Sequence, residues 1–107
     1  MLVMSRQVDE WVQIGDGVFV SPTDLDDKTV RVIARGRMVG GPDDGAPFES
    51  AHELSQGQSF AIGSMIVVTA LDLRPPVVRL GINRPKHVTV RRKEVVDAER
   101  KAKENGE

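Results

Sequence analysis

The sequence predicts a small, mainly β protein with a short C-terminal helix. Apolar residues make up 39% of the 107 residues but aromatic ones only 4%, so a core must be built largely from Val, Ile, Leu and Met, a mix that favours strands. Several stretches alternate apolar and polar residues, which is typical of half-buried strands. The segment from Lys93 to about Glu104 is rich in strong helix formers. The length fits one domain, residues 1–107.

The first strands are expected at the N-terminus. Residues 1–7 alternate between two faces, and Trp11 to Ile14 repeat that pattern after Asp9-Glu10, a pair suited to a tight turn. We therefore expect a β-hairpin from these two stretches.

A spacing of 48 residues relates two parts of the chain. It aligns residues 14–31 with residues 62–79 and gives seven identities in eighteen positions, Ile14-Gly15 with Ile62-Gly63 among them. We interpret this as a partial tandem copy of two strands, although chance similarity between alternating β sequences is an open alternative. The copies predict one strand pair, 18–21 with 29–35, as an extra hairpin, and a second pair, 65–71 with 77–82.

The region between the copies has few strand features. Residues 40–47 are rich in Gly, Pro and Asp, and residues 48–60 show little hydrophobic period. We expect a loose excursion there, with Phe48, Leu54 and Phe60 as the residues able to fix it to the core. A short last strand is expected at 88–90, followed by the helix.

Charge is unevenly distributed along the chain. The net charge is −1, but residues 1–73 hold five Lys/Arg against eleven Asp/Glu (−6), whereas residues 74–107 hold ten against five (+5). A local basic surface of this kind attracts polyanions, although a solvated charged helix is the simpler explanation of the charge alone. The chain has no cysteine, no leader-like segment and no stretch long enough for a membrane span. These features predict a cytoplasmic protein without disulfides or a membrane anchor.

Enzymatic activity is not expected. His52 and His87 are the only histidines, cysteine and tyrosine are absent, and no nucleophile or metalloprotease motif occurs. The sequence Asp24-x-Asp26-x-Lys28 places a cation where a calcium loop needs an oxygen ligand, so we interpret it as a turn. No metal and no cofactor are predicted.

Basic residues near the two ends are the candidates for binding. Arg91 and Arg92 lie between the last strand and the helix, with Lys86 just before them, and their planar guanidinium groups can donate to a guanine edge or to phosphate. Arg6 on the first strand supplies another guanidinium. The alternatives are that Arg6 pairs with a nearby carboxylate, Asp9 or Glu10, and that the arginine pair keeps an edge strand soluble.

Two separated segments form a combined pattern. They are Met1-Leu2-x-x-Ser5-Arg6 with Glu10 and Ile14-Gly15-Asp16, and Gly81-x-Asn83-x-Pro85 with Val88-x-Val90-x-Arg92-x-Glu94-Val95. Together they resemble the carbon storage regulator (CsrA/RsmA) family, small RNA-binding repressors of translation in bacteria. The resemblance covers about half of the chain, and residues from about 17 to 64 are interpreted as an insertion between the second and third strands. It implies a small five-stranded, intertwined homodimer with an extra inserted hairpin or loop.

The resemblance also implies a site and partners. Each RNA site would combine the first strand of one protomer with the last strand of its partner, and would bind GGA motifs in hairpin loops of mRNA 5′ leaders. Small RNAs that repeat the motif would sequester the protein. The residues carried over are Met4, Ser5, Arg6, Gln7, Lys86, Val90, Arg91 and Arg92. Gln7, Asp9, Arg84 and His87 depart from the usual family residues. A different class of function stays open, a protein-interaction module that binds, for example, a flagellar assembly factor and little RNA.

Overall fold

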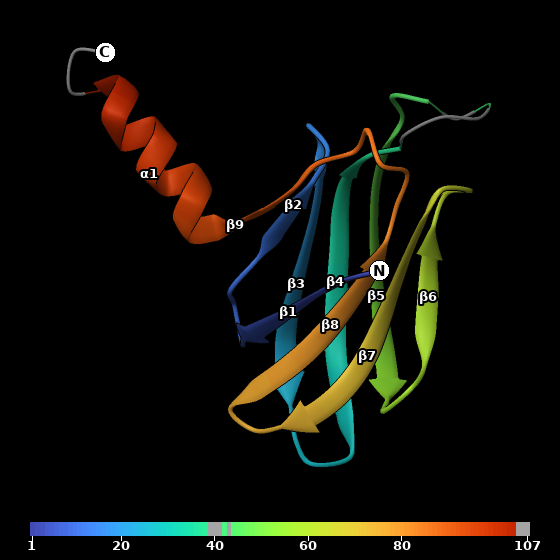
Figure 1. Ribbon diagram of the computed structural model, residues 1–107. Helices are drawn as coiled ribbons and strands as arrows, with labels where there is room; N and C mark the ends of the chain where they lie inside the picture. Colours follow the sequence, from blue (N-terminus) through green and yellow to red (C-terminus); the bar gives the residue numbers. More distant parts are fainter. Residues whose placement is uncertain (39–41, 43, 105–107) are drawn as a thin grey trace.

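The computed structural model describes residues 1–38, 42 and 44–104. In this part of the chain, strands form two antiparallel sheets and one helix follows them (Figure 1). The strands are β1 (Leu2–Gln7), β2 (Val12–Ile14), β3 (Val18–Leu25), β4 (Thr29–Arg37), β5 (Pro47–Ser55), β6 (Ser59–Ile62), β7 (Ile66–Arg74), β8 (Val77–Asn83) and β9 (Val90–Arg92), and the helix is α1 (Lys93–Glu104). The predicted mainly β class with a C-terminal helix is confirmed.

The two sheets share one apolar core. One sheet has the strand order β1-β8-β7-β6 and the other has the order β5-β4-β3-β2-β9. Alternate residues of the strands face inward, and the cluster that they form is dominated by valine, isoleucine and leucine. Ile14, Ile66 and Leu80 are among its fully buried side chains. The composition of the core is therefore the one that the scarcity of aromatic residues predicted.

Helix α1 extends away from the sheets (Figure 1). Val96 is buried, whereas Val95 is 47% exposed. No helix in the described residues is long and apolar enough to span a bilayer.

The predicted hairpin between the first two strands is wrong. β1 pairs with β8, whereas β2 pairs with β3 and β9. The turn itself is present, because Asp9 has a φ of 68° and the Glu10 amide donates to the Gln7 carbonyl at 3.1 Å. It leads the chain from one sheet into the other. Burial of an apolar side chain is worth about 1.5–3 kcal/mol, so the core, and not the turn, selects the strand partner.

Both strand pairs predicted from the repeat are present, β3 with β4 and β7 with β8. The turn between β3 and β4 is closed by Asp26, whose Oδ1 accepts hydrogen bonds from the backbone amides of Lys28 and Thr29, each at 2.7 Å. The β3–β4 pair is not a peripheral hairpin, however. It lies inside the five-stranded sheet, between β5 and β2.

The loose excursion expected after residue 47 is also wrong, because these residues form β5 and β6. β5 pairs with β4 over its whole length, from Pro47 opposite Arg37 to Ser55 opposite Thr29. The sequence hides this strand because Leu54 is its only buried residue. The preceding part of the expected excursion, residues 39–41 and 43, lies outside the described residues.

The 48-residue spacing relates the strands of the two sheets. Moved along by 48 positions, β1, β2, β3 and β4 fall on β5, β6, β7 and β8. The registers agree as well, since Arg6 lies opposite Val78 in the β1–β8 pair and Leu54 lies opposite Val30 in the β5–β4 pair. The first strand of each repeat therefore pairs with the fourth strand of the other repeat.

Backbone details repeat with the same spacing. The Asp9 amide donates to the Pro22 carbonyl at 2.7 Å, and the Gly57 amide donates to the Ala70 carbonyl at 2.6 Å. Asp9 and Gly57 both have positive φ, 68° and 88°. The register of β3 shifts directly after Pro22 and that of β7 directly after Ala70. The repeat is thus wider than the partial copy that the sequence indicated.

Candidate functional site

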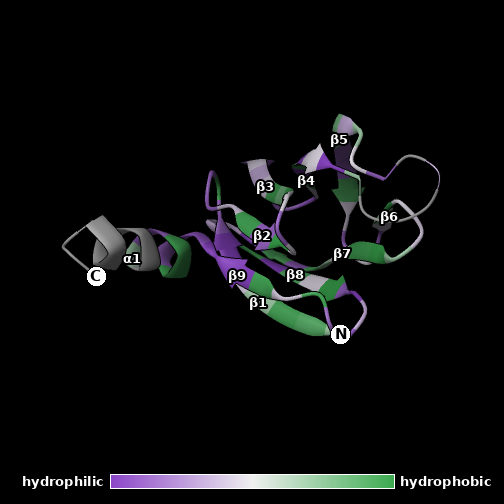
Figure 2. Cartoon of the chain, turned by 90° about the horizontal axis from the view of Figure 1, so that it is seen from above, coloured by the Kyte–Doolittle hydropathy of each residue, from purple (hydrophilic) through white to green (hydrophobic). Residues whose placement is uncertain are grey.

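The first and last strands of the chain meet at one end of the molecule. β1 is an edge strand of one sheet and β9 is an edge strand of the other. Figure 2 shows the two strands beside each other. An edge strand leaves every second backbone amide and carbonyl without a partner in the sheet. Two such edges therefore border a common surface, and both belong to one chain.

An ion pair between Arg6 of β1 and Glu94 of α1 fixes this arrangement. Arg6 Nη1 and Nη2 donate to Glu94 Oε1 and Oε2 at 2.7 and 2.9 Å, and Arg6 Nε donates to the Ser5 carbonyl at 2.8 Å. The Arg6 residue is only 4% exposed. A bidentate pair of this kind restricts both direction and distance. Arg6 therefore holds the strands together, and its partner is neither Asp9 nor Glu10, the carboxylates nearest in sequence.

Arg92 is placed on the side of its sheet that faces β1. It lies opposite Val12 in the β9–β2 pair, and directly opposite residues in antiparallel strands project from the same face. Val12 is fully buried in the core, so Arg92 projects from the core side at the edge of the sheet, where it is exposed. Its charge also contributes to lowering the pKa of Glu94. An exposed guanidinium thus lies beside the joined strands.

Arg91 points the other way. It lies opposite Gln13, whose side chain is on the outer face of the sheet. Val90 is half-buried against the core, and Lys86 is exposed in the connection between β8 and β9. Of the predicted residues on the last strand, the structure brings Arg92 close to β1 and turns Arg91 away from it.

The predicted residues of β1 divide in the same way. Met4 is buried at 6% exposure and belongs to the core. Ser5 and Gln7 alternate with the inward residues and are exposed. The backbone N–H of Gln7 donates to Glu10 Oε1 at 2.7 Å. Ser5 and Gln7 are therefore the first-strand side chains available to a ligand. The sequence did not predict a role for Glu94 in this site, because its partner Arg6 lies far away in the chain.

The folded protein is expected to lose stability at acid pH because Glu94 becomes protonated. The hydrogen bonds from Arg6 lower the pKa of Glu94 from 4.5 to about 2. A carboxyl group with a lowered pKa stabilises the fold above its ordinary pKa, and this contribution is lost as the pH falls from about 4.5 to 2. Thermal denaturation of the wild type and of Glu94→Gln across this range should show a steeper loss in the wild type. Asp26, whose pKa is lowered by the Thr29 and Lys28 amides, contributes to both proteins alike. Parallel curves would contradict the assignment.

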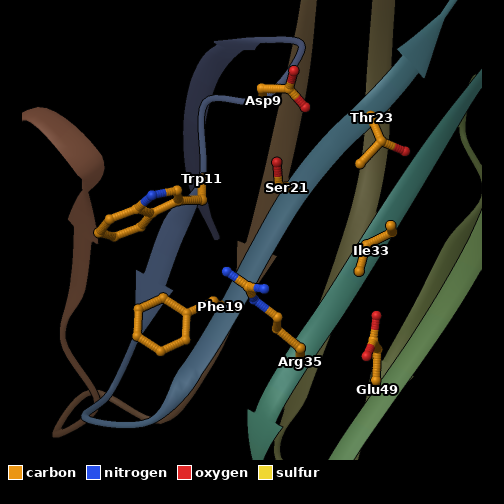
Figure 3. A pocket seen from close by; sticks show the side chains of 8 residues that line it. All are labelled: Asp9, Trp11, Phe19, Ser21, Thr23, Ile33, Arg35 and Glu49. Carbon is orange, nitrogen blue, oxygen red and sulfur yellow. The ribbon is translucent and has the colours of Figure 1, made fainter.

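A separate pocket lies on the outer face of the five-stranded sheet (Figure 3). Its volume is about 260 Å³. Trp11 and Phe19 meet there edge to face, with ring centroids 5.3 Å apart and planes at 82°. Trp11 is half-buried on this outer face, because its neighbour Val12 occupies the core side. The remaining lining residues are Asp9, Ser21, Thr23, Ile33, Arg35 and Glu49.

Comparison with known proteins finds similarity in the second half of the chain. Residues 55–101 match the family described as "CsrA: Global regulator protein family". The chain is 45% identical over 42 residues to the translational regulator CsrA of Pseudarthrobacter chlorophenolicus. This aligned stretch covers 39% of this chain and 54% of that relative. The chain thus spans about half the length of this curated relative. No solved structure matches it. The family match includes β9 and Lys86, and leaves out β1.

Proposed function

Because the chain belongs to the CsrA family of global regulators, which residues 55–101 match, we propose that it binds GGA motifs in hairpin loops of messenger RNA leaders and represses their translation. Its place of action would be the cytoplasm, where ribosomes initiate. Small RNAs that repeat the motif would act as competitors and release the messenger.

The observation that carries this proposal is the position of Arg92 beside the open edges of β1 and β9. The bases of an RNA loop have unpaired edges, and protein side chains read sequence there. A guanidinium can donate two parallel hydrogen bonds to O6 and N7 of a guanine, while the free backbone groups of an edge strand can bind the remaining base edges. Ser5 and Gln7 are exposed on β1, on the face opposite to Met4 and Arg6.

Electrostatics supports the same end of the molecule. Residues 74–107 carry a net charge of +5. Glu94, at the start of α1 directly after β9, is bonded to Arg6 of β1, so this basic segment lies at the candidate site. Attraction of phosphates depends on this local charge, and not on the overall value of −1.

A gel-shift assay tests the function. A hairpin with GGA in its loop is expected to bind, and the same hairpin with CCA should bind at least about tenfold more weakly, since each wrong base in a site costs roughly 1–3 kcal/mol. The salt concentration should be about 150 mM, where non-specific phosphate binding is reduced. Equal affinity for both hairpins would contradict the proposal.

One observation favours a second candidate function, the binding of a protein partner such as a flagellar assembly factor. The pocket with Trp11 and Phe19 lies on the outer face of the five-stranded sheet, and aromatic residues are enriched at protein interfaces. A chain with this function alone would shift neither hairpin.

A further inference from the structure

The internal repeat gives the molecule a second end that corresponds to the candidate RNA site. The 48-residue spacing maps β1 onto β5 and β2 onto β6. The place that corresponds to the β1 and β9 surface is therefore the outer edge of β6 together with β5. We infer, on the basis of the proposed function, that only the first of these two ends binds RNA, so that one chain works alone and holds a single RNA loop.

Within the part of the chain that the structure describes, the second end has no strand in the position of β9. β9 pairs with β2 at three positions, Ile14 with Val90, Gln13 with Arg91 and Val12 with Arg92. Among the described residues, no strand pairs with the outer edge of β6, which ends its sheet. Counting back 48 positions from Arg92 gives Asp44, which lies in a turn. The residue that would donate to guanine is thus replaced by a carboxylate outside any sheet.

The side chains of β5 have also lost the chemistry of β1. Glu53 takes the position of Ser5 and is exposed, so it places a negative charge where RNA phosphates would approach. Leu54 takes the position of Arg6 and is buried at 5% exposure. At the position of Met4, His52 stacks on Phe60, with ring centroids 3.9 Å apart and planes at 8°. At the second end, Leu54 and His52 of β5 pack against other apolar or aromatic side chains, and β5 contains no lysine or arginine.

The exchange of strands between repeats is complete within one chain. β1 pairs with the fourth strand of the second repeat, and β5 pairs with the fourth strand of the first. β9 is added to the sheet of the first repeat by pairing with β2. The candidate site therefore needs no second protomer, in place of the homodimer that the sequence resemblance predicted.

A protein with one site gains no avidity from transcripts that carry two motifs. A bivalent protein binds the second motif of the same RNA at a high effective concentration, which raises the overall affinity by 10² or more. For this chain we expect an RNA with two GGA loops to bind about twofold more tightly than an RNA with one loop, which is the statistical factor, and to take up two chains.

Titration calorimetry and light scattering test the site count. With a single-loop GGA hairpin we expect one RNA per chain, and without RNA we expect the mass of one chain, 11.7 kDa. Two hairpins per chain would overturn the single site. A mass of two chains would contradict the inference that one chain works alone. Absence of binding to every GGA hairpin would instead contradict the proposed function, with the mass still deciding whether the chain works alone.

A matched pair of variants locates the site. Arg92→Ala should leave no site with the wild-type affinity, because the chain has no second site, whereas Glu53→Ala, which changes the corresponding end, should leave both stoichiometry and affinity unchanged. Half of the binding capacity retained in Arg92→Ala would show a second site and contradict the inference. So would a loss of affinity in Glu53→Ala.

Discussion

Replacing Arg92 by alanine is expected to weaken binding of the GGA hairpin by roughly 5- to 150-fold. A bidentate contact between a guanidinium and a guanine edge is worth about 1–3 kcal/mol of discrimination. Arg92 is exposed, so its removal leaves the core intact. We therefore expect the change in affinity with no change in melting temperature, measured by fluorescence anisotropy and by circular dichroism.

Arg31→Ala is the matched control for this prediction, because it removes the same side chain and charge. Arg31 is exposed on β4, and two strands lie between β4 and β9 in the sheet. It should lower affinity only slightly, through the overall charge. An equal loss in both variants would indicate general phosphate attraction without base recognition, and unchanged affinity in Arg92→Ala would remove Arg92 from the site.

The second large effect concerns the ion pair of Arg6. Glu94→Ala leaves a guanidinium that is 4% exposed without its carboxylate. Removing one partner of a buried pair costs about 3–5 kcal/mol, and because the Glu94 side chain is 55% exposed we expect roughly 1–3 kcal/mol. In a protein of this size each 1 kcal/mol lowers the melting temperature by about 4–8 °C. Thermal denaturation followed by circular dichroism measures the change.

The repeat supplies a rescue for this variant. Leucine occupies the position of Arg6 in the second repeat, where Leu54 is buried. The double variant Arg6→Leu with Glu94→Ala should therefore recover much of the stability lost in Glu94→Ala. Asp97→Ala, which removes the exposed pair with Lys93, should have a small effect. A Glu94→Ala protein as stable as Asp97→Ala would contradict the role of the buried pair.

The parts of the fold that the sequence predicted are those with strong local patterns. β3, β4, β7 and β8 alternate clearly and carry the identities of the repeat, and α1 is composed of helix formers. β5 was missed because only Leu54 among its residues is buried. β1 and β5 share no identity at the 48-residue spacing, so their equivalence is visible only in the strand pairing.

The candidate site shows a similar limit. Alternation along β1 separates Met4 and Arg6 from Ser5 and Gln7, but it does not show what a buried arginine contacts. The partner of Arg6 is 88 residues away, at Glu94, and the sequence offered only the neighbouring carboxylates. Likewise, adjacent Arg91 and Arg92 are equivalent in sequence, and only the pairing of β9 with β2 separates their directions.

The pairing of β2 with β9 also has a consequence for synthesis of the protein. The five-stranded sheet begins with residues near the N-terminus but gains its last strand from Val90–Arg92. During translation, this sheet can close only after Val90–Arg92 have left the ribosome, long after β2 has done so. Contacts of such long range make folding slow. The unfinished edge of β2 is therefore exposed to chaperones and to other nascent chains until β9 has been synthesised.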